Sequence, residues 1–430
     1  MTDIRGEESK ATEKSCSQEK AKSPSKFETE KLVVNEKEKK KQAFITRSIW
    51  SLVMIFGFLI LIASGHLALI GIVYLFQVLT FKEIIGLTSE PARDKNIPYS
   101  RSLNWYFLFV TLYYLDGESY FDFFQEQVYA SRFLTTLVLN HKFISYSLFI
   151  TGLIFFVFSL TKGYYKFQFA QLCITHMTLL LVVVQSHLIA DNILNGIIWF
   201  LLPCSLVIVN DVFAYLCGIT FGRTQLLEIS PKKTVEGFVG AWICTGIAAV
   251  FFTYFLTRSD YMICPAENIT SNIFNFPECE PNPVFIPQFY QLPKVVSKYL
   301  HVDMITFKPI HFHSAMLATF ASLIAPFGGF FASGLKRAFG IKDFGDTIPG
   351  HGGITDRMDC QFLMGSFSYL YYQTFISVAN INVGKILQTA ILNLSVAQLL
   401  QLIKSLLRYL HSIGVIDDEK LRSLFGLLEI

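Results

Sequence analysis

Charge is scarce in this sequence. Only 16% of its 430 residues are charged, whereas soluble domains carry about 25%. Hydrophobic residues make up 52% of the chain, and the mean hydropathy is +0.44. The charge is also uneven, because the first 47 residues hold 12 of the 36 Lys and Arg residues. This composition excludes an ordinary soluble protein and predicts an all-α, polytopic integral membrane protein.

Three further absences narrow the class of protein. The eight cysteines include no CxxC pair, which argues against structural zinc and thioredoxin-type chemistry. The net charge is only +3 and no basic stripe alternates with aromatic residues, which argues against nucleic-acid binding. The N-terminus lacks the order of basic residues, apolar core and cleavage site that marks a signal peptide.

Nine apolar segments approach the ~20 residues that a membrane-spanning helix needs. They are 49–63, 67–79, 103–115, 144–160, 167–184, 188–209, 238–256, 312–327 and 362–378. Residues 1–46, rich in Lys, Glu and Ser, predict a disordered cytosolic tail ahead of a transmembrane domain over 47–380. Residues 381–430 predict an amphipathic C-terminal helical segment. It lies along the membrane interface or packs on a partner helix, and its few cations favour packing.

The distribution of cations predicts the orientation in the membrane. Lys39–Lys41 and Arg47 precede the first apolar segment, which favours a cytosolic N-terminus. Counting the crossings then places the polar stretches 210–236 and 333–359 on the cytosolic side and the loop 257–309 in the lumen. If all nine segments span the membrane, the C-terminus is lumenal.

The loop 257–309 carries two features of a lumenal segment. Asn268–Thr270 is an N-glycosylation sequon, and Cys264 and Cys279 can pair in an oxidising compartment. Both features are common by chance. Their agreement with the cation count is what supports the orientation.

The two polar stretches contain the residues expected to carry chemistry, because charge beside a membrane is costly. The second reads SGLKRAFGIKDFGDTIPGHGGITDRMD over 333–359, and the first includes SPKKTVEG over 230–237. Their Lys and Arg side chains suit phosphate groups, and their glycines let backbone amides approach an anion. Asp356 and Asp359, three residues apart at a helix start, suit Mg²⁺. Singly, such lysines anchor helices and such an Asp pair caps one, but clustered they indicate a polyphosphate site.

These stretches also carry a resemblance. The second resembles the signature of phosphatidate cytidylyltransferases (CDP-diacylglycerol synthases) over 333–359, and the first resembles the same family from Asp211 onward. The similarity covers residues 47–372, and the long tail and extra helices resemble the eukaryotic branch. Val235 stands where a tryptophan is usual, and Gly329 stands where bacterial members carry an acid. Asp211 is the nearest candidate to compensate for that acid.

The resemblance implies a reaction and a cofactor. CTP and phosphatidate give CDP-diacylglycerol and pyrophosphate with Mg²⁺, at a cytosol-facing site in the endoplasmic reticulum membrane. An oxygen of the phosphatidate phosphate attacks the α-phosphorus of CTP directly, so that no protein nucleophile is needed. The expected partners are these two substrates and membrane lipid, and the oligomeric state, a homo-oligomer included, stays open.

The candidate site residues take three roles under this resemblance. The catalytic group comprises Lys336, Arg337, Lys342, Asp343 and His351. The substrate-binding group comprises Ser230, Lys232, Lys233, Ser333 and Arg357. The metal-binding group comprises Asp356, Asp359 and Asp343, with Asp211 as a further candidate ligand.

Two other functions fit parts of the pattern. A CTP-dependent polyprenol kinase would use nucleotide and metal in the same way, but would leave the cytidine in a water-soluble product. A transporter would place charged residues between its helices, normally in the middle of the spans. The charges here lie in glycine-rich loops at helix ends, which favours an enzyme.

Overall fold

The computed structural model describes most of the chain as two compact units, Met1–Leu370 and Tyr371–Ile430. The described residues are 26–94, 97–123, 132–266, 271–275, 279–291, 304–350, 352–377, 390, 394–418 and 420–422. Helices dominate both units, so the all-α prediction is confirmed.

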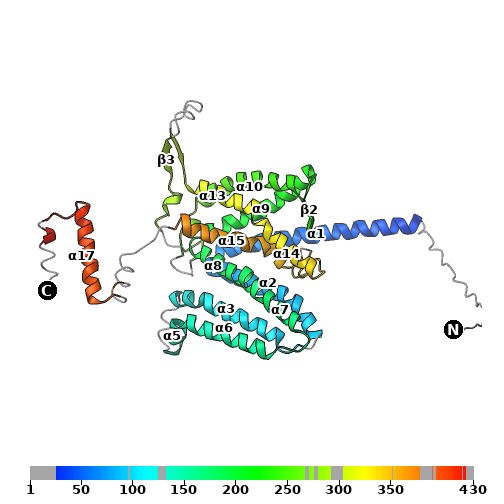
Figure 1. Cartoon of the computed structure of the whole chain (residues 1–430). Coiled ribbons are helices and arrows are strands. Elements are labelled where there is room, and N and C mark those ends of the chain that lie inside the picture. The colour runs from blue at the N-terminus through cyan, green and yellow to red at the C-terminus, as the bar shows by residue number, and fades with distance from the viewer. Residues whose placement is uncertain are drawn as a thin grey trace, which may run out of the picture. The chain divides into compact units, whose positions relative to one another are not determined.

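Helices make up most of the first unit (Figure 1). They are α1 Lys26–Ser64, α2 His66–Asp94, α3 Ser100–Phe123, α5 Arg132–Leu139, α6 His141–Phe158, α7 Tyr165–Thr178, the π-helical turn η1 Leu179–Val184, α8 Gln185–Leu194, α9 Ile198–Phe221, α10 Val235–Leu256, α11 Asp260–Ile263, the 3₁₀ turn η2 Pro283–Phe285, α13 Ile310–Leu323, α14 Pro326–Ala338 and α15 Thr355–Phe375. Two antiparallel hairpins complete it, β1 Gln225–Leu227 with β2 Ser230–Thr234 and β3 Gln288–Gln291 with β4 Met304–Phe307.

Seven helical stretches in the described part of the chain are long and apolar enough to cross a membrane. They are Ile45–Ser64, His66–Ser89, His141–Phe158, Tyr165–Leu194, Ile198–Phe221, Val235–Leu256 and Ile310–Ala338. The two remaining predicted segments fall on α3 and α15, which have 24 and 21 residues but more polar side chains. The chain is therefore a polytopic α-helical membrane protein.

The predicted segment 188–209 is not one helix. The structure ends α8 at Leu194 and begins α9 at Ile198, with Gly196 between them at φ +132°. Only glycine adopts this backbone conformation readily, and a Cβ at Gly196 would also lie 3.2 Å from the carbonyl oxygen of Ile263. The preceding span therefore extends to Leu194, and the number of predicted crossings is unchanged.

The N-terminal helix is longer than the apolar pattern predicts. α1 begins at Lys26, inside the segment 1–46 that composition assigned to a disordered tail. The added part reads KFETEKLVVNEKEKKKQAF, in which Glu and Lys are strong helix formers and stand at helical spacing. Residues 1–25 lie outside the described part of the chain.

Close packing of α15 against α8 and α9 fixes the position of α15. Gly365 leaves no room for a side chain beside Ile189, and the Asn192 amide donates a hydrogen bond to the Gly365 carbonyl at 2.9 Å. Ser368 likewise donates to the Trp199 carbonyl of α9 at 3.0 Å. These buried contacts fix α15 relative to the two helices that flank the Gly196 break.

The loop after α10 covers one end of the first unit. The Tyr261 hydroxyl donates to the Ile62 carbonyl at 2.5 Å, and the Ala266 amide donates to the Leu194 carbonyl at 2.8 Å. Cys264 and Cys279 form a disulfide in this loop, as the sequence suggested, whereas the sequon over 268–270 lies outside the described residues. Figure 1 shows β3 at this end and β2 with the end of α14 at the opposite end. The two polar stretches thus share one end of the first unit.

The second unit contains α17, Val396–Ser412. A capping box begins it, in which the side chains of Ser395 and Gln398 bond the backbone amides of each other. The helix is strongly amphipathic and none of its residues is buried. The choice between the membrane interface and a partner helix stays a prediction.

Candidate active site

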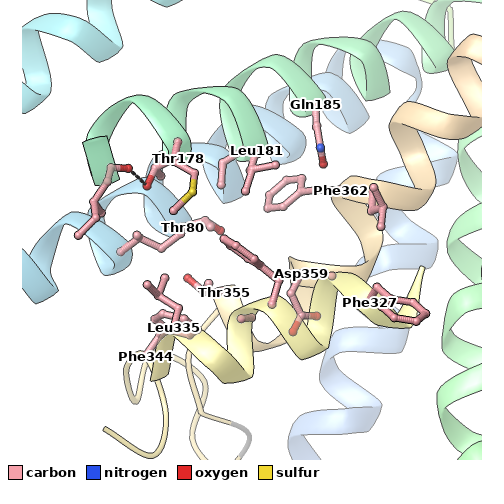
Figure 2. Close-up of a pocket in the computed structure, with 18 residues that line it drawn as sticks. Thr80, Thr178, Leu181, Gln185, Phe327, Leu335, Phe344, Thr355, Asp359 and Phe362 are labelled. Carbon is pink, nitrogen blue, oxygen red and sulfur yellow. Dashed lines mark hydrogen bonds between the residues drawn. The ribbon is translucent and has the colours of Figure 1, made fainter. Parts of the chain in front are cut away.

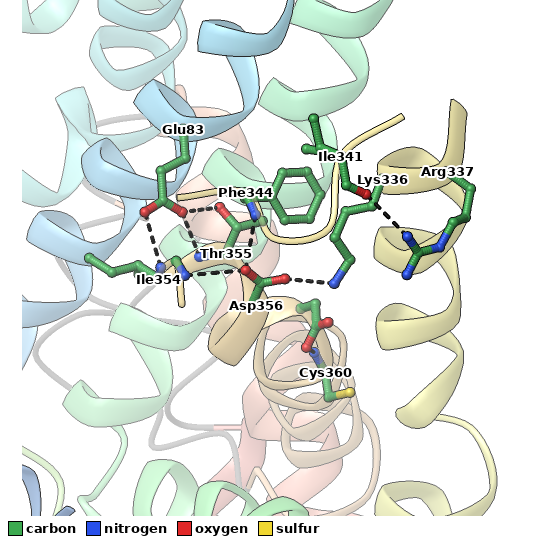
Figure 3. Close-up of polar contacts among 11 residues, drawn as sticks. Glu83, Lys336, Arg337, Ile341, Phe344, Ile354, Thr355, Asp356 and Cys360 are labelled. Carbon is green, nitrogen blue, oxygen red and sulfur yellow. Dashed lines mark hydrogen bonds and ion pairs between the residues drawn. The ribbon is translucent and has the colours of Figure 1, made fainter. Parts of the chain in front are cut away.

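The second polar stretch forms a loop between α14 and α15, and Asp356 holds it together (Figure 3). One carboxylate oxygen of Asp356 accepts a hydrogen bond from Lys336 Nζ at 2.6 Å. The other oxygen accepts from the backbone amides of Phe344 at 3.1 Å and Gly353 at 3.2 Å. Both side chains of the ion pair are largely buried, with exposures of 13% for Lys336 and 8% for Asp356. The Asp356 carboxylate is therefore engaged within the protein.

Glu83 of α2 fixes the same loop from the other side, and the sequence reasoning missed it. Its carboxylate accepts from the hydroxyl of Thr347 at 2.6 Å and from the backbone amide of Ile354 at 3.1 Å. It also accepts from the amide and hydroxyl of Thr355 at 2.9 and 2.7 Å. Glu83 thus satisfies amides at the start of α15, as an N-terminal capping carboxylate does. An acid within an otherwise apolar span was the available signal.

A second cluster joins the two polar stretches. Lys233 of β2 lies over the Phe330 ring of α14, 4.9 Å from its centroid. It is close enough to Asp211 of α9 and Asp359 of α15 to interact with both carboxylates. Arg357 also interacts electrostatically with Asp211. Residues up to 148 positions apart in the sequence thus form one charged cluster.

Asp359 is an unusual carboxylate. It precedes the apolar part of α15, which begins at Phe362. Burial and the neighbouring Asp211 raise its pKa to about 6, although the hydrogen bond from the Cys360 amide and the charge of Lys233 oppose the shift. Two carboxylates that share a buried site repel each other, so that a bound cation would stabilise both.

Gly329 explains how Asp211 and Asp359 come together. A Cβ at Gly329 would lie 3.3 Å from a carboxylate oxygen of Asp359, so that an acid at this position would point at the same site. Here the glycine leaves that space open, and Asp211 supplies the second carboxylate near Asp359. The structure therefore places Asp211 close enough to Asp359 to compensate for the acid that is missing at position 329.

The β1–β2 hairpin positions Lys233. Glu236, at the start of α10, accepts from the backbone amides of Arg223 at 3.0 Å and Thr224 at 3.2 Å. Thr234 caps α10 by accepting from the Gly237 amide at 3.2 Å. The polar residues around the hairpin thus fold the segment that carries Lys233.

The remaining predicted residues are placed as follows. Arg337 is exposed and donates to the Ile341 carbonyl at 3.2 Å. Lys342 and Asp343 are exposed in the loop, Ser333 lies on α14 and Ser230 begins β2. His351 and the side chain of Lys232 lie outside the described part of the chain. The structure therefore brings together Asp211, Lys233, Arg357 and Asp359. Arg337, in the last turn of α14, and Lys342, in the loop that follows, are exposed at the surface.

The fit of a metal ion depends on which carboxylates remain available. Among the described residues, no group of three or more His, Cys, Asp or Glu side chains could hold a metal ion. Asp356, a predicted ligand, is bound to Lys336 and two amides. The pair Asp211 and Asp359 remains. Mg²⁺ commonly takes one or two protein carboxylates and completes its shell with water and substrate phosphates, so this pair fits an ion shared with a nucleotide.

A cavity of about 300 Å³ lies beside Asp359 (Figure 2). Its walls come from α2, α7, η1, α8, α14 and α15, and they are mostly apolar, with Leu181, Leu335 and Phe362 among the lining residues. Asp359 and Thr355 are two of the few polar residues that line it. The charged cluster therefore borders a volume suited to hydrocarbon.

Comparison with known proteins agrees with this arrangement. The sequence model of the cytidylyltransferase family matches residues 45–375. The chain belongs to the cytidylyltransferase family. The match runs from the apolar part of α1 to the end of α15, so that every element of this cytidylyltransferase site lies inside it.

Three relatives of this cytidylyltransferase match over most of their length. The phosphatidate cytidylyltransferase of Saccharomyces cerevisiae is 56% identical over 393 residues, which cover 91% of this chain and 86% of the relative. Phosphatidate cytidylyltransferase 1 of Homo sapiens is 44% identical over 372 residues, 86% of this chain and 80% of the relative. Phosphatidate cytidylyltransferase 1 of Arabidopsis thaliana is 42% identical over 368 residues, 85% of this chain and 86% of the relative.

Proposed function

We propose that this chain is a membrane enzyme that makes CDP-diacylglycerol and pyrophosphate from CTP and phosphatidate. The similarity to fungal, plant and mammalian phosphatidate cytidylyltransferases supports the reaction. One structural observation carries the proposal: Asp359 belongs both to the charged cluster and to the wall of the apolar cavity. An enzyme that joins a nucleotide to a lipid phosphate needs a charged site for the phosphates directly beside an apolar cavity for the acyl chains.

The reaction requires charge neutralisation more than a protein nucleophile. A phosphate oxygen of phosphatidate forms a bond to the α-phosphorus of CTP, and the bond from that phosphorus to the bridging oxygen of the β-phosphate breaks. Lys233 and Arg357 lie where they can hold two polyanions together and offset charge as it develops. Mg²⁺ held by Asp211 and Asp359 would supply further positive charge to the triphosphate.

The loop between α14 and α15 is proposed to hold the triphosphate and the leaving pyrophosphate. Lys342 is exposed on this loop, and the last turn of α14 beside it carries the exposed Arg337 and Lys336, which Asp356 holds. The proposed substrate contacts include Ser230, Lys232 and Ser333. His351 is proposed to orient a substrate or to donate a hydrogen bond to it. Asp343 lies next to Asp356, since a Cβ at Gly352 would touch both side chains, and it is proposed to support the loop.

The proposed location is the endoplasmic reticulum membrane with the active site facing the cytosol. Arg47, at the start of the first span, approaches Gly350 of the active-site loop, so the cation-rich flank of α1 and the site share one end. The preference of cations for the cytosolic side supports this orientation.

Reconstituted protein with phosphatidate and CTP labelled in the cytidine carbons tests the function. The label is expected to enter the lipid fraction, in step with release of pyrophosphate. A polyprenol-kinase activity would instead leave the label in water-soluble CDP. Absence of CTP consumption together with solute flux into the vesicles would favour a transporter.

Filling the apolar cavity should separate lipid binding from nucleotide chemistry. Leu181→Trp adds bulk to the cavity wall, and overpacking of this kind costs about 1–3 kcal/mol. We expect KM for long-chain phosphatidate to rise about tenfold, while KM for CTP and turnover of a short-chain analogue stay near wild type. Leu180→Trp is the matched control, because Leu180 is 61% exposed and does not line the cavity. Equal behaviour of the two variants would remove the cavity from the lipid site.

A further inference from the structure

A second cavity, of about 430 Å³, lies between the C-terminal part of α2 and the start of α3. It shares no lining residue with the cavity beside Asp359. Ile84 lines the first cavity and Ile85 lines the second, so the two cavities lie on different faces of α2. Lys82 lines the second cavity and directly precedes Glu83, which places this cavity at the active-site end of the first unit.

Two cations without acidic partners line this second cavity. Lys82 of α2 and Arg101 of α3 are both exposed, and neither forms an ion pair with another residue that the structure describes. Ser89, Ser100 and Ser102 line it as well, and of their hydroxyls that of Ser89 already donates to the Ile85 carbonyl at 2.8 Å. Positive charge and hydroxyl donors in one cavity suit an anion with several oxygen atoms.

The first turn of α3 adds to this preference. Ser100, Arg101 and Ser102 open the helix and line the cavity, and the turn contains no acidic residue. Backbone amides at a helix N-terminus lack intrahelical acceptors and carry partial positive charge, which favours phosphate. A buried polar side chain in the cavity favours the same class of ligand.

Asn104 contributes a buried donor without a hydrogen-bond partner in the described part of the chain. The residue lines this cavity and a smaller adjoining one, and only 4% of it is exposed. Its carbonyl oxygen accepts from the Thr175 hydroxyl at 2.9 Å, whereas its Nδ2 donor has no hydrogen-bond partner in the described part of the chain. A buried donor without an acceptor costs about 1–3 kcal/mol, so an acceptor that enters the cavity would recover this energy.

We propose that this cavity binds the phosphate of an anionic phospholipid head group, separately from the reacting phosphatidate. Phosphate chemistry follows from the two cations, the helix N-terminus and the Asn104 donor. A lipid source is favoured over free phosphate because Tyr99 and Trp105 line the same cavity beside Ile85 and Ile97. Trp and Tyr are enriched where head groups meet the hydrocarbon core, and the α2 span ends at Ser89 beside this cavity.

Native mass spectrometry of the full-length protein with phosphatidylglycerol, an anionic lipid that is not the proposed substrate, tests this site. Lys82→Gln with Arg101→Gln is expected to weaken lipid binding about tenfold, because two charge-assisted contacts are lost. Lys162→Gln with Lys166→Gln is the matched control. Both lysines are exposed and flank the α6–α7 turn, and Gln171 of α7 bonds Ser100 of α3. This control removes the same charge near the cavity and should bind as wild type does.

Ser102→Glu is a second variant that should fold normally, because an acidic residue in the first turn of a helix is stabilising. It places a negative charge at the cavity and should also weaken phosphatidylglycerol binding about tenfold. Leu181→Trp, which alters only the first cavity, should leave this binding unchanged. Wild-type affinity in both Ser102→Glu and the Lys82, Arg101 double variant would overturn the proposal.

Two further ligands identify the source of the phosphate. Phosphatidylcholine, whose head group is neutral overall, is expected to bind more weakly than phosphatidylglycerol and to respond little to the double variant. Displacement of phosphatidylglycerol by an equal concentration of inorganic phosphate would support an anion site but overturn a lipid as its occupant.

Discussion

Asp359→Asn is expected to reduce turnover roughly 10³-fold while the protein remains folded. Asn keeps the shape of the side chain but removes the negative charge that faces Lys233 and Asp211. Because burial already disfavours the charged carboxylate, neutralisation should not destabilise the fold. The measurement is kcat with saturating CTP, together with the melting temperature of the purified protein.

Asp346→Asn is the matched control for this variant, since Asp346 lies exposed in the same loop. It should keep nearly full activity. Asp356→Asn should differ from both, because it leaves Lys336 without its carboxylate and loosens two backbone amides, so that activity and melting temperature fall together. A fully active Asp359→Asn enzyme would remove Asp359 from the reaction.

Glu83→Gln is expected to lower turnover about 10- to 100-fold without a direct contact to substrate. The carboxylate accepts four hydrogen bonds from the loop that carries the signature, and hydrogen bonds to a charged group are worth about 1.5–3 kcal/mol each. An amide accepts at only one end and presents a donor to groups that also donate. The loop should therefore lose its fixed conformation.

Hydrogen exchange distinguishes this positioning role from general damage. In Glu83→Gln the amides of Ile354 and Thr355 should exchange faster, whereas the helices around Gly365 should keep their protection. Glu228→Gln, a change in the exposed β1–β2 turn, should alter neither exchange nor turnover. Unchanged loop protection in Glu83→Gln would refute the role assigned to Glu83.

The membrane-spanning architecture was largely predictable because it depends on local composition. Long apolar runs dictate helices in a bilayer whatever their neighbours are, so every predicted segment except 188–209 coincides with one helical stretch, apart from a few residues at the ends. The exception, 188–209, has a sequence signal for a break, since Asn195 and Gly196 interrupt the apolar run. The helical extension of α1 to Lys26 was missed because a charge-rich composition was weighed above the helix propensity of Glu and Lys.

The candidate site was only partly predictable. The spacing of Asp356 and Asp359 predicted that both lie on one helix. It did not predict their different environments, because the environment of each carboxylate depends on which residues pack against it. Asp356 meets Lys336 and the loop amides, and Asp359 meets Asp211 and Lys233. Glu83 lies 264 to 272 residues from its partners, a pairing that no local pattern encodes.

We propose that Asp211 and Asp359 hold a divalent ion together with the nucleotide, and electron paramagnetic resonance of Mn²⁺ measures this binding. Mn²⁺ replaces Mg²⁺ at oxygen sites, and its spectrum reports binding without turnover. Protein and CTP together are expected to bind Mn²⁺ tightly. Asp359→Asn and Asp211→Asn should each weaken this binding, whereas Asp346→Asn should not. Wild-type affinity for Mn²⁺ with CTP in both Asp359→Asn and Asp211→Asn would contradict this proposal.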